Sequence, residues 1–311
     1  MTATTPDAPD VLAATDARPT ATRNARQARQ RHNGALASPR QRNSKVAASV
    51  ILAVIGLAFV IPLGWILLAA FDSAATVSVK LPTSVTLNNF TEITNWETTF
   101  RPLWNSLVIS MGTAIITVLC SVLAAYPLSR YQARWRKPFM YTVLFGTCLP
   151  ITAMMVPVYA LFVAFGLLDN LGGTILFLAA TSLPMAIWMT KNFMDSIPVS
   201  LEEAAWVDGA SAMTALWRIV VPLMRPGIAV VFIFVFTQAW GNFFVPFVLL
   251  FSETSQPAAV AIFGFFGTYG TISYGRLAAF SILYSVPVLA LYLLVQRLSG
   301  SSFAMAGAVK G

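Results

Sequence analysis

Gln238 and Asn242 are the polar residues whose type and spacing best suit the binding of a small ligand. They lie four residues apart in an apolar stretch, so a helix would carry both amides on one face. Trp240, Phe243 and Phe244 are their neighbours in the sequence. Amides can hydrogen-bond to sugar hydroxyls, and aromatic rings can cover the apolar faces of a sugar. We expect these five residues to line a substrate pathway, although the two amides could instead bond to neighbouring helices.

A second candidate site is a short helix with a face of small residues. Ser200 followed by Glu203 has the spacing of a capping box, which predicts where the helix begins. Gly209 is the residue type that commonly ends a helix. Ala204 and Ala205 lie on the helix between these signals, and such small side chains let another backbone approach closely. The pattern predicts a docking element rather than a catalytic one.

A second short amphipathic helix is predicted directly after Gly209. Met213, Leu216, Trp217 and Val220 recur at the spacing of one helical face. Pro222 is expected to end this helix, because proline cannot continue the hydrogen-bond pattern of a helix interior.

The elements that position both sites are predicted to be membrane-spanning helices. The chain has 311 residues, of which 57% are hydrophobic and only 10% charged, whereas about a quarter of a soluble domain is charged. Crossing a bilayer takes about 20 apolar residues. Six stretches without Asp, Glu, Lys or Arg are long enough: Val46–Phe71, Pro102–Ser129, Pro138–Leu168, Leu171–Thr190, Pro226–Ser252 and Leu277–Gln296. We therefore expect an all-α integral membrane protein with six transmembrane helices.

The distribution of positive charge predicts the orientation of these helices. If the N-terminus is cytoplasmic, 17 of the 20 Lys and Arg residues lie in cytoplasmic segments, as positively charged loops usually do. Both termini and residues 198–225, between spans four and five, are then cytoplasmic. Short basic loops beside anionic lipid headgroups account for the net charge of +8, so a nucleic-acid partner is not expected.

Residues 1–45 differ in composition from the membrane domain expected at 46–311. They are rich in Ala, Thr, Arg, Gln and Asn and poor in large apolar residues, which predicts a disordered basic cytoplasmic tail. The only histidine, His32, lies in this tail, and Cys120 and Cys148 lie in apolar runs. No metal site is therefore expected.

The segment at 198–225 resembles the EAA motif of binding-protein-dependent ABC importers. That motif reads Glu-Ala-Ala, three residues, Gly, nine residues, Ile, one residue, Leu, Pro; this chain has Val221 in place of the Leu and the same spacing throughout. In the family this loop is the coupling helix, which sits in a cleft of the ATPase subunit. The resemblance assigns ATPase coupling to Glu203, Ala204, Ala205, Asp208, Gly209, Ile219 and Pro222. An ordinary pair of interfacial helices is the alternative.

The rest of the sequence from about Val46 also resembles this family, and most of all the smaller permease of the maltose-type sugar systems. The resemblance implies a bacterial multi-pass cell-membrane protein. Its implied partners are membrane lipid, a second permease, two ATPase subunits that hold ATP and Mg, and an extracytoplasmic sugar-binding protein. In the family the C-terminal tail reaches the ATPases, which implies such a role for Lys310 and Gly311. The family usually has Trp-Asn-Glu-Phe where this chain has Trp240-Gly-Asn-Phe243, so the carboxylate is missing.

The sequence lacks the residues that several activities would require. No Walker loop is present, so the chain is not expected to bind ATP itself, and no catalytic or cofactor-binding constellation is visible. No charged residue lies in the middle of a predicted span, as a proton- or sodium-coupled carrier would usually require. The sequence therefore favours a non-enzymatic importer subunit. An ATP-independent carrier or channel is the alternative hypothesis. A membrane enzyme is the third.

Overall fold

The computed structural model describes residues 39–78, 80–82, 84–131, 134–266 and 272–299. The regular secondary structure in these ranges is helical, and the extended pairings are two isolated bridges, Asp72 with Val85 and Phe266 with Ile272. This confirms the predicted all-α class for the described part of the chain. The chain divides after Pro62 into two units, which are described separately here.

Four described helices are long and apolar enough to cross a membrane: α2 (Pro39–Ala70), α4 (Arg101–Arg130), α7 (Leu171–Asp195) and α14 (Tyr274–Ser299). Two bent pairs meet the same test. In the first, α5 (Arg136–Gly146) meets α6 (Ile151–Ala164) at 88°. In the second, the helical segment Ala212–Leu223 meets α11 (Arg225–Trp240) at 80°. The described residues therefore contain four candidate membrane spans, or up to six if each bent pair is one span.

Two of the predicted spans are interrupted. The predicted span Pro138–Leu168 breaks between Gly146 and Ile151, where Pro150 has no backbone N–H to continue the helix. The predicted span Pro226–Ser252 stops at Trp240, and α12 (Phe244–Leu249) follows as a separate short helix. The first helix, by contrast, begins at Pro39, before the predicted start of its apolar run at Val46.

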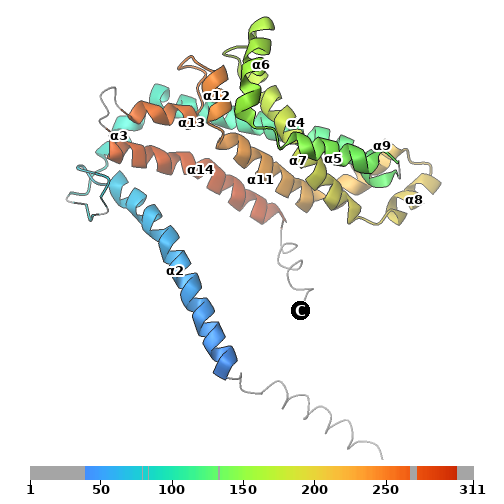
Figure 1. Ribbon diagram of the computed structural model, residues 1–311, viewed down its shortest axis with the longest axis horizontal. Helices are drawn as coiled ribbons and strands as arrows, with labels where there is room; N and C mark the ends of the chain where they lie inside the picture. Colours follow the sequence, from blue (N-terminus) through green and yellow to red (C-terminus); the bar gives the residue numbers. More distant parts are fainter. Residues whose placement is uncertain (1–38, 79, 83, 132–133, 267–271, 300–311) are drawn as a thin grey trace, which may run out of the picture. The chain divides into compact units, whose positions relative to one another are not determined.

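The core of the unit from Leu63 onward lies between α4, α7 and α11, which run side by side (Figure 1). Hydroxyl groups cross the contact between α4 and α7: Thr117 donates to the Ala179 carbonyl oxygen, and Ser121 bonds to Thr190. Such small polar residues let membrane helices approach closely and satisfy each other. This close contact fixes the two helices that lead to both candidate sites.

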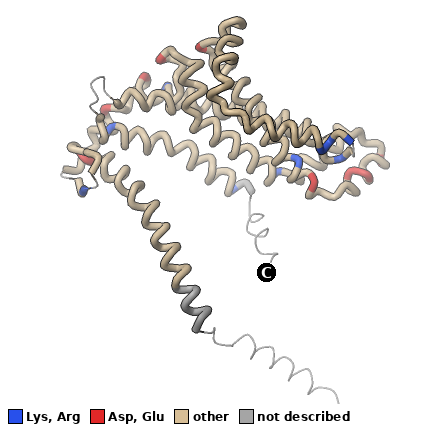
Figure 2. The backbone as a smooth tube through the Cα atoms, in the orientation of Figure 1, with Lys and Arg blue, Asp and Glu red and all other residues tan. Residues whose placement is uncertain are grey.

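The short elements connect and cover these helices. They are α3 (Asn88–Ile93), η1 (Trp96–Phe100), α8 (Ser200–Val207), α9 (Ala212–Ala215), η2 (Leu216–Val220), α10 (Val221–Leu223), α13 (Ala258–Ala261) and η3 (Ile262–Phe265). In the unit from Leu63 onward, charged residues gather at the helix ends and in the connections (Figure 2). The lengths between them are apolar, as lipid-facing segments require.

Candidate docking helix and central cavity

The first candidate site is α8, whose end was predicted correctly and whose start was not. Its N-cap is Val199, and no side chain caps the helix, so the predicted capping box of Ser200 and Glu203 is wrong. The Glu203 N–H instead bonds to the Val199 carbonyl oxygen, which draws Ser200 into the first turn. The helix ends at Val207, and Gly209 follows in the terminating turn as predicted, with a φ of 85°, a left-handed conformation that glycine adopts without strain.

The residues of α8 that were predicted to dock lie on an open surface. Glu203, Ala204, Asp208 and Gly209 are exposed, and Ala205 is half-buried. A Cβ added at Gly209 would meet no atom within 4 Å. This face is therefore open to solvent in the described part of the chain, and Ala204 and Gly209 on it are small enough for close approach by another backbone.

The second predicted helix forms as the continuous series α9, η2 and α10. Ser211 caps it by accepting a hydrogen bond from the Thr214 N–H. Of the predicted apolar face, Leu216 and Val220 are fully buried, but Met213 and Trp217 are exposed by 53% and 42%. The predicted face is thus only half correct, because the π-helical turn Leu216–Val220 rotates the side chains relative to a regular α-helix.

Ile219 and Pro222 close this series. Both are half-buried, and the helix passes Pro222 to end one residue later, at Leu223. They lie in η2 and α10 and not on α8 itself.

Glu202 is a site residue that sequence reasoning missed. Its side chain is completely buried, and it accepts hydrogen bonds from the Tyr126 hydroxyl at 2.8 Å and from Arg130 Nε at 2.6 Å. The neighbouring Glu203 is exposed. A signal was present in the sequence, because two adjacent glutamates on a helix point in different directions and α4 ends with both partners, Tyr126 and Arg130.

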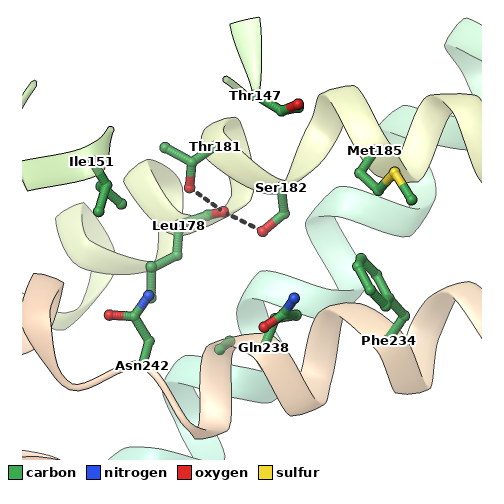
Figure 3. A pocket seen from close by; sticks show the side chains of 10 residues that line it. Thr147, Ile151, Leu178, Thr181, Ser182, Met185, Phe234, Gln238 and Asn242 are labelled. Carbon is green, nitrogen blue, oxygen red and sulfur yellow. Dashed lines mark hydrogen bonds between the residues drawn. The ribbon is translucent and has the colours of Figure 1, made fainter. Parts of the chain in front are cut away.

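The second candidate site is a cavity of about 340 Å³ between α7 and α11, beside the break between α5 and α6. Its polar lining consists of uncharged side chains: Thr147, Thr181, Ser182, Gln238 and Asn242. Figure 3 shows Thr181 and Ser182 on one helix opposite Gln238 on the other. Both hydroxyls donate to the Leu178 carbonyl oxygen, so their lone pairs remain free to accept.

The structure brings only part of the predicted pathway set to this cavity. Gln238 and Asn242 line it. Trp240 is 4% exposed and stacks in the core on Phe236 and Tyr284. Asn242 also holds the start of α12, because its Oδ1 accepts a hydrogen bond from the Val245 N–H.

The two phenylalanines of the set face other neighbours. Phe243 stacks on Phe247 and Phe263, and Phe244 packs against the apolar cluster that contains Leu249. Gln238 and Asn242, four residues apart, thus stay together at the cavity, whereas the three aromatic residues face other parts of the fold.

The loop after α12 is held by two polar anchors. Asp169 accepts hydrogen bonds from the hydroxyls of Ser252 and Ser255, and Asn105 donates to the carbonyl oxygens of Thr254 and Gln256. Burial raises the pKa of Asp169, but the hydrogen bonds from Ser252, Ser255 and the backbone together outweigh it and hold the pKa below its usual range.

Two further expectations concern the ends of the chain and metals. The predicted ATPase-contacting residues Lys310 and Gly311 lie outside the described residues. In the part of the chain that the structure describes, no group of three or more His, Cys, Asp and Glu side chains could hold a metal ion.

The comparison with protein families decides what kind of protein carries these two sites. The model of the family described as "Binding-protein-dependent transport system inner membrane component" matches residues 117–301. The chain belongs to this family. The match includes α8, the series α9 to α10 and the whole cavity lining, so both candidate sites lie in the family's own domain.

Relatives and solved structures agree with this assignment. The trehalose transport system permease protein SugB of Mycobacterium tuberculosis is 31% identical over 261 residues, covering 83% of this chain and 94% of the relative. The galactooligosaccharides transport system permease protein GanQ of Bacillus subtilis is 29% identical, covering 84% and 94%. A crystal structure of a bacterial ABC transporter that imports the acidic polysaccharide alginate has the same fold, with a TM-score of 0.73, 23% identity, and coverage of 84% and 98%.

The chain is therefore a permease subunit of a binding-protein-dependent ABC importer, in the bacterial inner membrane. In this family the ATPase is carried by separate subunits, so the predicted transport role without enzymatic activity is confirmed. The alternative of an ATP-independent carrier or channel is not favoured.

Proposed function

We propose that this permease forms half of the translocation pathway of an ATP-driven sugar importer. It crosses the membrane six times, with each bent helix pair as one span and both termini in the cytoplasm. The distribution of Lys and Arg supports this orientation, since it leaves only Lys80, Arg101 and Arg276 outside.

The exposed small-residue face of α8 docks into a cytoplasmic ATPase. The observation that carries this role is the surface of Glu203, Ala204, Asp208 and Gly209, which is open to solvent in the described part of the chain. ATP and Mg bind at two such ATPase subunits, and their closure moves α8.

The cavity between α7 and α11 takes a neutral sugar. Its polar groups are three hydroxyls and two amides, which can donate to and accept from sugar hydroxyls without the cost of desolvating a charge. Relatives that transport trehalose and galactooligosaccharides favour a di- or oligosaccharide as the cargo. A second permease supplies the other side of the pathway.

An extracytoplasmic binding protein delivers the sugar. One solved relative is an alginate transporter in complex with its pentasaccharide-bound periplasmic protein, with a TM-score of 0.63 and 19% identity. In this chain the loop from Phe251 to Phe266, which Asp169 and Asn105 hold in place, is the surface offered to that protein.

A detergent pull-down of tagged chain tests the proposal. We expect wild-type chain to recover an ATPase and a second permease, and Glu203→Lys to recover much less ATPase. Glu253→Lys is the matched control, because Glu253 is also exposed but lies in the loop held by Asn105 near the start of α4, whereas α8 is bonded to the end of α4. The proposal is wrong if the chain purifies alone, or if Glu203→Lys and Glu253→Lys recover the same amount of ATPase.

A further inference from the structure

Arg130 and Glu202 form a buried ion pair beneath the docking helix. Their side chains are 3% and 0% exposed, and Arg130 Nε donates to Glu202 Oε1 at 2.6 Å. Tyr126 donates to the other carboxylate oxygen at 2.8 Å. Both partners come from the last turns of α4, so α8 is tied to a membrane helix by three groups that water does not reach.

Arg130 also bonds in a second direction. Its Nη1 donates to Ser129 at 3.2 Å, and Ser129 donates to Asp195 on α7 at 2.6 Å. Asp195 accepts in addition from Lys191 on its own helix, and Arg136 at the start of α5 lies 3.9 Å away. A continuous polar chain thus leads from α8 through α4 to α7.

A buried series of polar contacts like this one is a costly way to stabilise the fold. Burying two charges removes them from water, and well-packed apolar residues often serve stability equally well. Arg130 Nη2 is moreover buried without a hydrogen-bond partner in the described structure. A purely structural contact would not need a buried guanidinium that joins α4 to α8 and also bonds to Ser129, the residue that reaches Asp195 on the cavity-lining helix α7.

We propose that Arg130 is a positioning residue for transport: its bond to Glu202 joins α8 to α4, and its bond to Ser129 orients the hydroxyl that joins α4 to Asp195 of α7, so that the three helices move as one body. ATPase closure then reaches the cavity-lining residues of α7, among them Thr181 and Ser182. This role rests on the proposed docking of α8, but it differs from docking, because none of Tyr126, Arg130 and Glu202 lies on the exposed face.

The test follows the opening of the cavity directly. The complete transporter is reconstituted with a reporter cysteine at cavity-lining Met185 and with Cys120 and Cys148 replaced by Ala. The rate of labelling by a cationic methanethiosulfonate is measured without nucleotide and after trapping with ATP and vanadate. In the parent protein we expect trapping to change this rate by about tenfold, a typical coupling between two sites.

Variants of the pair should separate docking from transmission. Arg130→Lys and Glu202→Gln are expected to retain co-purifying ATPase and ATP hydrolysis but to lose the change in labelling rate. Arg130→Met/Glu202→Leu leaves no unpaired buried charge, so it should fold even if the single variants do not. We expect this double variant to lose the change as well.

The control pair is Arg101 and Glu97, an exposed i,i+4 ion pair at the other end of α4. Arg101→Met/Glu97→Leu should keep the full change in labelling rate. The proposal is overturned if Arg130→Met/Glu202→Leu restores the parental change, or if it loses the ATPase altogether, since the pair would then serve only stability or docking. A parent that neither binds an ATPase nor responds to trapping would overturn the proposed function, and this proposal with it.

Discussion

The docking helix α8 and the cavity segment from Gln238 to Phe244 were both singled out from the sequence, and they fared differently in the structure. Of the residues assigned to coupling, Glu203, Ala204, Asp208 and Gly209 lie together on the exposed surface of α8 and the turn that follows it. Ile219 and Pro222 lie in η2 and α10. Those assigned to the cavity segment separate, with two in the cavity and Trp240 in the core. A docking surface on one short helix depends on local sequence. A cavity depends on where distant helices bend.

The largest expected effect comes from Gly209→Asp in α8. The side chain adds charge to the docking face and forces a left-handed backbone on a residue with a Cβ, so uptake should be abolished while membrane insertion persists. Uptake in reconstituted vesicles and the amount of co-purifying ATPase measure the effect.

Gly166→Asp is the matched control for this variant. Gly166 also has a positive φ, 63°, and open space around its Cβ position, but it lies in the turn before α7. We expect it to carry the same backbone strain and to keep its ATPase. Equal loss of ATPase in both variants would mean that strain, and not the docking face, is responsible.

Asp169→Asn should loosen the loop after α12. Asparagine tolerates the left-handed φ of 57° at this position, but it loses the charge-assisted hydrogen bonds from Ser252 and Ser255. We expect a loss of about 1–2 kcal/mol in thermal or denaturant unfolding of the detergent-solubilised protein.

The stability of the protein at low pH should also show the contribution of the Asp169 carboxylate. Because the pKa of Asp169 is held below its usual range, its stabilisation is present above the unfolded pKa of about 3.9 and is lost as the pH falls through the folded pKa. The Asp169→Asn variant should lack this part of the acid dependence, whereas Glu253→Gln should retain it. Identical acid profiles for wild type and Asp169→Asn would count against the anchor.

Gln238→Leu should weaken sugar transport modestly. Removing one neutral hydrogen-bonding group while keeping its volume should raise the KM for uptake by about 2–10-fold, with little change in ATPase activity. Trp240→Phe, in the core beside the cavity, should leave the KM unchanged. The opposite result, a KM that responds to Trp240 and not to Gln238, would contradict the assignment of the pathway to this cavity.

The smallest expected effect is a difference in stability between alanine variants of Ser211 and Ser200. Ser211→Ala removes the N-cap of α9 and should lower stability by about 1 kcal/mol, whereas Ser200→Ala removes no cap and should be neutral. Unfolding of the two variants under the same conditions measures the difference. A cost at Ser200 equal to that at Ser211 would restore the predicted capping box.

What the sequence could predict follows from how local each signal is. The apolar runs, the end of α8 before Gly209 and the family resemblance of residues 198–225 depend on near neighbours, and they were predicted. The apolar runs could not show that helices break at Pro150 and after Trp240, since the flanking residues are as apolar as the rest.

The buried partner of the docking helix is the clearest case that local reasoning missed. Glu202 and Glu203 are adjacent and chemically identical, and only the packing of α4 against α8 decides which of them is buried. The same holds for the cavity, where hydroxyls of α7 join amides of α11 from about 57 residues away in the sequence.

The most direct test of the account is photo-crosslinking from the docking face. A benzophenone is attached to Ala204→Cys on α8 or, as the control, to Phe251→Cys at the opposite end, with Cys120 and Cys148 replaced by Ala. Illumination of the assembled transporter should join the ATPase to the chain labelled at 204 and not to the chain labelled at 251. Absence of an ATPase adduct at 204, or equal adducts from both positions, would contradict the claim that α8 is the docking helix.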